Sequence, residues 1–77
     1  MNITIKYFGL LAEIAKRSDE TITFTKTTVS ELLEVLYEKY PELKEKDFQV
    51  AQNLEIVPKD AVLTEADIAL LPPFSGG

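Results

Sequence analysis

Short extended patterns and one short helical pattern alternate through the first third of the chain. Apolar and polar residues alternate over residues 3–8, which predicts a strand. Gly9 breaks this alternation, and apolar residues over 10–15 then follow helical spacing, which predicts a short helix. Alternation returns over 21–25, where two apolar residues are interleaved with threonines. This stretch predicts a second strand with β-branched side chains on its outer face.

The longest periodic pattern begins at Thr28. Thr28 and Glu31 form a capping-box pair, in which a hydroxyl at the helix start is followed three residues later by a carboxylate. Pro41 cannot continue a helix, so the helix is expected to end just before it. The apolar residues between these limits form one continuous stripe at helical spacing: Val29, Leu32, Leu33, Leu36, Tyr37 and Tyr40. We interpret this stripe as core.

The remaining elements are short. Residues 42–47 read as a charged loop, and residues 48–57 predict one or two strands with a turn at Gln52-Asn53. A last strand is expected over 68–71. One main helix packed on one face of a mixed sheet gives an α+β domain, and the order of elements resembles that of the ubiquitin-like β-grasp fold. We therefore expect a β-grasp domain over residues 1–71, followed by an extended, flexible C-terminal tail over 72–77.

Composition narrows the possible chemistry. The 77 residues suffice for one small domain, and an apolar fraction of 45% is typical of a globular protein. The chain has no cysteine and no histidine, which excludes disulfides, thiolate nucleophiles and Cys/His zinc sites. It also removes the commonest general acid and base. We expect no metal site and no catalytic activity from the chain alone.

The charge and hydropathy of the chain bear on its partners and its location. The net charge of −5 argues against nucleic-acid binding, which requires a patch of lysine and arginine. The same charge either favours a basic protein partner or simply keeps the domain soluble, and the sequence leaves both open. No apolar run approaches the length of a membrane span, and the first residues do not resemble a signal peptide. We expect a cytoplasmic protein without membrane association.

The last eight residues, LLPPFSGG, are unusual for a chain terminus. A frayed end gains nothing from apolar residues such as Leu71 and Phe74. Consecutive prolines restrict the backbone, so the tail is expected to project from the domain in an extended form. Gly76 and Gly77 have no side chain, so they could pass through a narrow channel and present the α-carboxylate of Gly77. That carboxylate becomes reactive once a better leaving group, such as adenylate, is attached.

The segment IALLPPFSGG at residues 68–77 resembles the C-terminal signature of the MoaD-type sulfur carriers, the small subunits of molybdopterin synthases. Two further segments resemble the same family: ITIKYFGLLAEI at residues 3–14 and VAQNLEIV at residues 50–57. The resemblance covers essentially the full chain in length and order. It implies a sulfur carrier of molybdenum cofactor biosynthesis.

The resemblance also implies partners and residue roles. A separate ATP-dependent enzyme would adenylate Gly77 and convert it to a thiocarboxylate, so ATP belongs to that partner and no cofactor is held stably. The tail, including Gly76, would enter a pocket of the large synthase subunit and pass sulfur to a pterin precursor. The residues expected to bind partners are Phe8, Leu71, Pro72, Pro73, Phe74 and Ser75.

Three other functions remain open from the sequence. The chain could be the sulfur carrier of thiamine-thiazole synthesis, or a ubiquitin-like modifier that is joined to lysines of other proteins. It could also be a ubiquitin-like interaction module with an inert tail. The position of Phe8 is open as well: it shares strand parity with Thr4 and Lys6, which favours the exposed face, but it could pack under the first helix instead.

Overall fold

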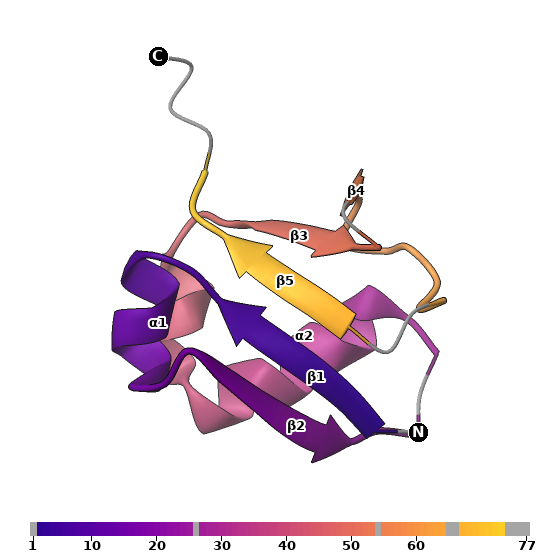
Figure 1. Ribbon diagram of the computed structural model, residues 1–77, viewed down its shortest axis with the longest axis horizontal. Coiled ribbons are helices and arrows are strands. Elements are labelled where there is room, and N and C mark those ends of the chain that lie inside the picture. The colour runs from indigo at the N-terminus through magenta and orange to yellow at the C-terminus, as the bar shows by residue number, and fades with distance from the viewer. Residues whose placement is uncertain (1, 26, 54, 65–66, 74–77) are drawn as a thin grey trace.

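A computed structural model describes residues 2–25, 27–53, 55–64 and 67–73 of the chain. Within these ranges, a five-stranded sheet is covered on one face by helices (Figure 1). The elements in chain order are β1 (Asn2–Tyr7), α1 (Leu10–Ala15), β2 (Asp19–Thr23), α2 (Val29–Lys39), the 3₁₀ helix η1 (Pro41–Glu45), β3 (Gln49–Gln52), β4 (Glu55–Val57) and β5 (Asp67–Leu71).

The sheet is mixed, as predicted, with the strand order β2-β1-β5-β3-β4. The central strands β1 and β5 are parallel, whereas β2, β3 and β4 each run antiparallel to the neighbour they join. Because β1 and β5 are parallel neighbours, their carboxyl ends meet at one edge of the sheet (Figure 1). This edge is where the segment carrying the predicted functional residues leaves the domain.

The main helix begins as the sequence predicts. The hydroxyl of Thr28 accepts a hydrogen bond from the backbone N–H of Glu31 at 3.3 Å and donates one to Glu31 Oε1 at 2.9 Å. The helix ends at Lys39, before Pro41. The expectation of a charged loop after it is wrong, since residues 41–45 form η1. Pro41 presets the backbone at the start of this helix, and the fully buried Leu43 anchors it to the core.

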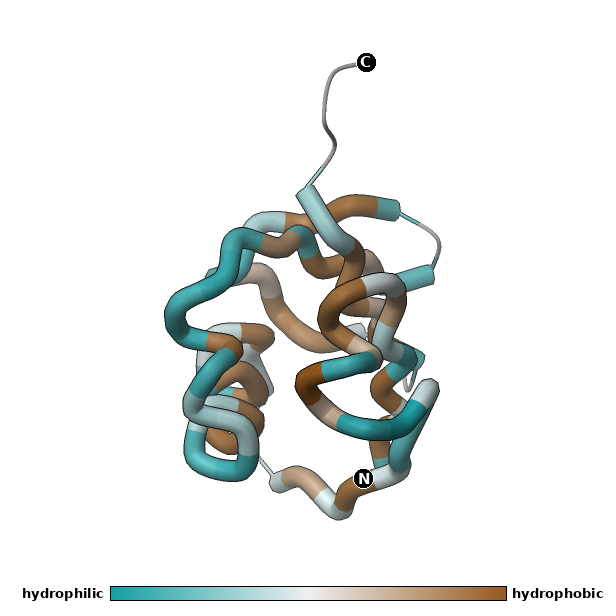
Figure 2. The backbone as a smooth tube through the Cα atoms, turned by 90° about the vertical axis from the view of Figure 1, so that its left-hand side faces the viewer, coloured by the Kyte–Doolittle hydropathy of each residue, from teal (hydrophilic) through white to brown (hydrophobic). Residues whose placement is uncertain are grey.

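The core lies between the sheet and α2. Odd-numbered residues of β1 face inward and even-numbered residues face solvent, as period-two alternation requires. In Figure 2 the hydrophobic segments of the tube face one another across the interior. The largest fully buried side chains are Ile3, Ile5, Leu11, Leu32, Leu36, Leu43, Ile68 and Leu70, with Val29 and Val50. The stripe predicted on the main helix contributes Val29, Leu32, Leu33 and Leu36 to this core.

The second strand starts earlier than predicted. It spans Asp19–Thr23 rather than residues 21–25, and Glu20 pairs with Ile5 across the strands. This register turns Glu20 toward the interior, where only 7% of its surface is exposed. The antiparallel hydrogen bonding between β1 and β2 continues beyond the strand, where Tyr7 N donates to Ser18 O at 2.9 Å. This pairing extends β2 through polar residues, which the hydrophobic pattern could not identify as strand.

Candidate functional site

The candidate site lies at the edge where β1 and β5 end. The backbone N–H of Phe8 donates to the carbonyl of Leu70 at 3.2 Å, so β1 and β5 stay paired up to their last residues. Leu71 ends β5 and is partly exposed, and Pro72 and Pro73 follow it with exposed side chains. The chain therefore leaves the sheet from its central strand and not from its rim.

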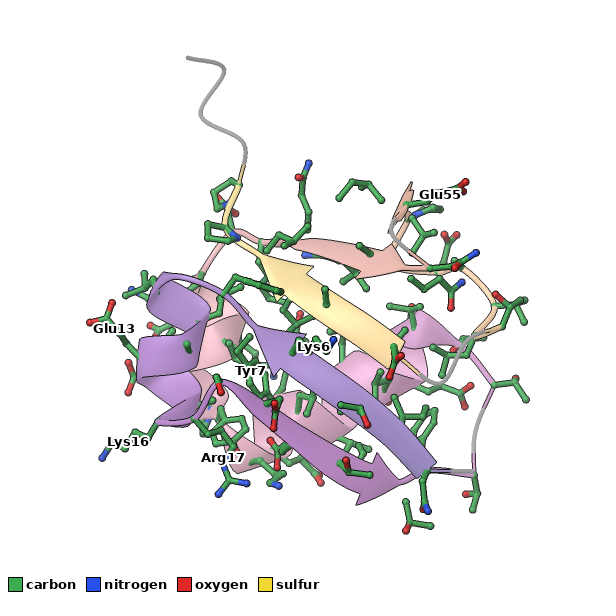
Figure 3. All side chains as sticks on the ribbon, in the orientation of Figure 1. Lys6, Tyr7, Glu13, Lys16, Arg17 and Glu55 are labelled. Atoms are coloured by element: carbon green, nitrogen blue, oxygen red, sulfur yellow. The ribbon has the colours of Figure 1, made fainter. Side chains whose placement is uncertain are left out.

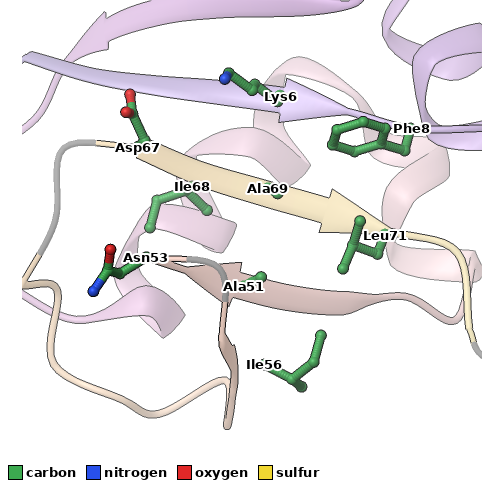
Figure 4. A pocket seen from close by; sticks show the side chains of 9 residues that line it. All are labelled: Lys6, Phe8, Ala51, Asn53, Ile56, Asp67, Ile68, Ala69 and Leu71. Atoms are coloured by element: carbon green, nitrogen blue, oxygen red, sulfur yellow. The ribbon is translucent and has the colours of Figure 1, made fainter.

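An apolar hollow opens on the uncovered sheet face beside this edge. We define the apolar hollow by Phe8, Ala51, Ile56, Ala69 and Leu71, with a volume of about 360 Å³. Figure 4 shows these side chains on the face of the sheet opposite the helices. Three polar residues also line it: Lys6, Asn53 and Asp67.

The hollow follows from the strand register. Lys6 pairs with Ala69 across β1 and β5, and Ala69 pairs with Ala51 across β5 and β3. Ala51 in turn pairs with Ile56 on β4. Two alanines at neighbouring positions make a low floor, and larger apolar side chains stand around it. Among these, Phe8 is 45% exposed and Ile56 is 55% exposed, so together they present apolar surface that a partner can bury.

The same sheet face is polar away from this edge. The hydroxyl groups of Thr4 and Thr21 are hydrogen-bonded to each other at 3.1 Å, and Thr23 donates to Asn2 Oδ1 at 3.1 Å. The apolar surface is thus confined to the part of the face that adjoins the departing chain. Because these apolar residues are grouped and not scattered, the hollow is a candidate docking surface.

The structure answers the open question about Phe8. Its side chain lies on the uncovered sheet face and lines the same hollow as Leu71, as strand parity favoured. Leu71, Pro72 and Pro73 lie at the edge as expected. The predicted residues Phe74, Ser75, Gly76 and Gly77 lie outside the described residues.

Three residues of the hollow were missed at the level of sequence: Ala51, Ile56 and Ala69. The signal was present in part, because Ala69 shares strand parity with Leu71, which was predicted to bind partners. Ala51 and Ile56 could not be found in this way. Their positions depend on the register of β3 and β4, which a short strand with an uncertain turn does not reveal.

A second hollow, of about 260 Å³, lies on the helix side of the same edge. Pro72 and Pro73 line it together with Leu10 and Leu11 from α1 and with residues 45–47. Leu10 is 49% exposed.

The strongest electrostatic feature lies elsewhere, around Glu20. Glu20 Oε1 accepts hydrogen bonds from Tyr7 at 2.6 Å and from Tyr40 at 2.7 Å, and Oε2 accepts one from Lys39 Nζ at 2.6 Å. Arg17 lies 3.5 Å from Oε2. We call Glu20 and these four residues the Glu20 network, and Figure 3 shows Tyr7 and Arg17 near α1.

Burial and hydrogen bonding oppose each other at Glu20. Burial alone would raise the pKa of Glu20, but hydrogen bonds from Lys39, Tyr7 and Tyr40 outweigh it and lower the pKa from 4.5 to about 2. Burial and the hydrogen bond to Glu20 raise the pKa values of Tyr7 and Tyr40. These groups hold fixed protonation states at neutral pH, so the network suits structural support rather than proton transfer.

The described ranges contain no cluster of three or more Asp, Glu, His or Cys side chains suited to a metal ion. No helix within them is long and apolar enough to cross a membrane.

Comparison with known proteins places this geometry in a family. The model of the ThiS family matches residues 5–77. A molybdopterin synthase sulfur carrier subunit from Caenorhabditis briggsae is 32% identical, and the alignment covers 100% of this chain and 99% of that protein.

Solved structures share the fold. A candidate molybdopterin converting factor, subunit 1, from Pyrococcus furiosus matches with a TM-score of 0.86 at 22% identity, covering 96% of this chain and 99% of that one. The small archaeal modifier protein 1 of Haloferax volcanii matches with a TM-score of 0.80 at 22% identity, covering 95% and 98%. These structures confirm the ubiquitin-like β-grasp fold. With the family model spanning nearly all of its residues, the chain belongs to the ThiS family.

Proposed function

We propose that this protein is the sulfur carrier subunit of a molybdopterin synthase and acts in the cytoplasm. The observation that carries the proposal is the end-to-end similarity to the Caenorhabditis briggsae sulfur carrier subunit, at 32% identity. The resemblance of residues 68–77 to the signature of these carriers supports it, because this segment holds the reactive terminus. The chain has no side chain suited to sulfur chemistry, so the reactive group must be a main-chain one.

The proposed chemistry uses the α-carboxylate of Gly77. An activating enzyme binds ATP, and the carboxylate oxygen attacks the α-phosphorus and displaces pyrophosphate. A sulfur donor at the level of hydrosulfide then attacks the acyl carbon and expels AMP, leaving a thiocarboxylate. The terminal sulfur is passed on to a pterin precursor in the large subunit, and a carboxylate is regenerated when water replaces the sulfur.

The described geometry supports docking of the large subunit at the sheet edge. A partner that receives the tail has to approach the end of β5, where the apolar hollow opens. Phe8, Ile56 and Leu71 offer aromatic and aliphatic surface there, and such side chains dominate the energy of protein interfaces. The tail and the hollow then act together, since one delivers the reactive atom and the other supplies affinity.

A second candidate function is protein modification, and it rests on the fold shared with the small archaeal modifier protein 1. Adenylation of Gly77 is common to both functions, but the final acceptor is a lysine amine in modification. A carrier of thiamine-thiazole synthesis would likewise share the activation step and differ in its acceptor. The acceptor therefore distinguishes these candidates, and adenylation alone does not.

Sulfur transfer tests the proposal. The full chain is incubated with an activating enzyme, ATP, a sulfur donor, the large subunit and the pterin precursor, and dithiolene product is measured. We expect product from the wild type and none after deletion of Gly77 or addition of one alanine after Gly77. Gly76→Val should retain docking but lose transfer, because its side chain obstructs a narrow channel.

Controls separate the alternatives. Deletion of Gly77 should leave the melting temperature unchanged, because glycine has no side chain to bury. Full activity in the deleted protein would overturn the carrier proposal in favour of an interaction module. Isopeptide-linked conjugates without dithiolene product would favour the modifier.

A further inference from the structure

Gly9 and Pro72 lie in contact where the two central strands separate. A Cβ atom added at Gly9 would lie 2.8 Å from Pro72 Cγ, which is closer than two carbon atoms can pack. The proline ring therefore occupies space that any other residue at position 9 would fill. Gly9 belongs to the turn after β1, and Pro72 is the first residue after β5.

The backbone of Gly9 has a second constraint. Its φ of 58° and ψ of −132° lie in a region that glycine adopts readily and other residues avoid. Leu11 N donates to Phe8 O at 3.1 Å, so Gly9 is the first central residue of a tight turn. This turn sends the chain away from the sheet into α1. A merely local role in that turn would explain the torsion angles but not the contact with Pro72.

The topology gives the contact its consequence. β1 and β5 are parallel neighbours that reach the same edge of the sheet. Beyond Phe8, the segment that follows β1 must turn aside for the segment that follows β5 to continue. The turn at Gly9 leads from β1 into α1, and the ring of Pro72 packs into the space beside Gly9. Pro72 and Pro73 also line the second hollow, together with Leu10 and residues 45–47. Pro72 therefore borders both Gly9 and the second hollow.

We propose that Gly9 is a positioning residue for the C-terminal tail: its contact with Pro72 sets the direction in which the chain leaves the domain. The effect of this contact on activity rests on the proposed function, in which the tail enters a partner's active site while the apolar hollow is docked. The contact itself is independent of any partner. Proline restricts φ, so an orientation fixed at Pro72 persists through Pro73.

A double-mutant cycle separates the contact from the local turn. Gly9→Ala is made in the wild type and in a Pro72→Ala background, and kcat and KM for adenylation are measured with the activating enzyme. If Gly9 acts through Pro72, Gly9→Ala should lower kcat/KM about 10- to 100-fold in the wild type, the scale of a misplaced reacting group, mostly through kcat. The same substitution should cost several-fold less once the ring is absent, because coupled positions are non-additive.

A matched control addresses stability. Lys16 ends the same helix with a φ of 60°, so Lys16→Val introduces backbone strain at the end of α1 away from Pro72. It should lower the melting temperature and leave adenylation unchanged at temperatures where the protein is folded. If Lys16→Val impairs adenylation as much as Gly9→Ala, loss of helix stability explains both and the proposal fails.

A direct measurement of tail direction requires no partner. The chain has no native cysteine, so Ser75→Cys and Glu34→Cys accept a unique pair of spin labels. Pulsed electron resonance should give a distance distribution that shifts or broadens in Gly9→Ala and stays unchanged in Lys16→Val. Identical distributions in the wild type and Gly9→Ala would overturn the inference even if the protein is adenylated. A shifted distribution with no adenylation of any variant would instead overturn the proposed function alone.

Discussion

Tyr7 and Phe8 are adjacent aromatic residues at the end of one strand, yet they belong to opposite regions of the molecule. Tyr7 is 3% exposed and donates to Glu20 in the interior, whereas Phe8 is 45% exposed and lines the apolar hollow. The Glu20 network is centred on a buried, charged carboxylate, and the apolar hollow is exposed and uncharged at its floor. Each reverses the usual distribution of residues in a globular protein.

The difference between the two regions indicates which unusual feature, the buried charge or the exposed apolar surface, is related to function. The buried carboxylate has a partner for both of its oxygens, and among the described residues no buried side-chain nitrogen or oxygen lacks a hydrogen bond. Such a network is complete within the chain and needs no partner. Among the residues that the structure describes, nothing covers the exposed surface of Phe8 and Ile56. We therefore assign stability to the first region and recognition to the second.

Removing the carboxylate should have the largest effect on stability. In Glu20→Ala, the hydroxyl groups of Tyr7 and Tyr40 lose their acceptor in a buried site, while Lys39 can turn to solvent. We expect the free energy of unfolding to fall by about 3 kcal/mol, the scale for breaking a buried charged interaction. Denaturant unfolding measures this. Unchanged binding of the large subunit by the folded fraction would support the separation of stability from recognition. An unchanged free energy of unfolding would contradict the stabilising role of the Glu20 network.

Acid should act on the same region. The pKa of Glu20 is about 2 in the folded protein against 4.5 without its partners, so the folded state binds a proton less readily than the unfolded state. The resulting stability is present above the unfolded pKa and is lost as the pH falls from about 5 toward 2, by about 3 kcal/mol in total. Denaturant midpoints measured across this pH range test it. A Glu20→Gln variant with the same loss over this window would contradict the assignment to Glu20.

Substitution in the apolar hollow should have the reverse profile. Phe8→Ala should weaken binding of the large subunit by about 1–3 kcal/mol, as expected for an aromatic interface anchor, and change folding stability much less. Thr4→Ala, on the polar part of the same sheet face, is the matched control and should bind normally. Calorimetric titration compares them. Equal affinities for wild type and Phe8→Ala would show that the hollow is not part of the interface.

Phe74→Ala extends this test to the tail. We expect it, too, to weaken binding by about 1–3 kcal/mol if Phe74 is a second anchor of the complex. Binding is measured against the same large subunit, with Gly76→Val as a control that should dock normally. Equal weakening by Gly76→Val would mean that any change in the tail disturbs docking, and Phe74 would then have no special role as an anchor.

Salt should have the smallest effect on affinity. We expect the net charge of −5 only to steer association, because exposed charges act on encounter and are screened over about 8–10 Å at physiological ionic strength. Raising salt should therefore slow association and leave dissociation almost unchanged. Stopped-flow binding at two salt concentrations separates the rates. Binding abolished by moderate salt, with Phe8→Ala unaffected, would mean that charge and not apolar contact holds the complex.

The sequence predicts much of this architecture because periodic apolar patterns specify it. The capping box at Thr28, the break at Gly9 and the last strand before Pro72 are confirmed. Glu20 was missed, because a buried carboxylate in a polar stretch leaves no hydrophobic signal. The alanine floor of the hollow was missed as well, since it depends on pairing between distant strands. Tertiary register, rather than local pattern, determines both.

The central claim is that the main-chain carboxylate of Gly77 carries the sulfur. The most direct test is intact-mass analysis of the full chain after incubation with ATP, a sulfur donor and an activating enzyme that is active on its cognate carrier. We predict a mass gain equal to the exchange of one oxygen for sulfur, located on the C-terminal peptide by fragmentation and absent without ATP or after deletion of Gly77. An unchanged mass in the folded wild-type protein, under conditions where the cognate carrier is converted, would contradict it.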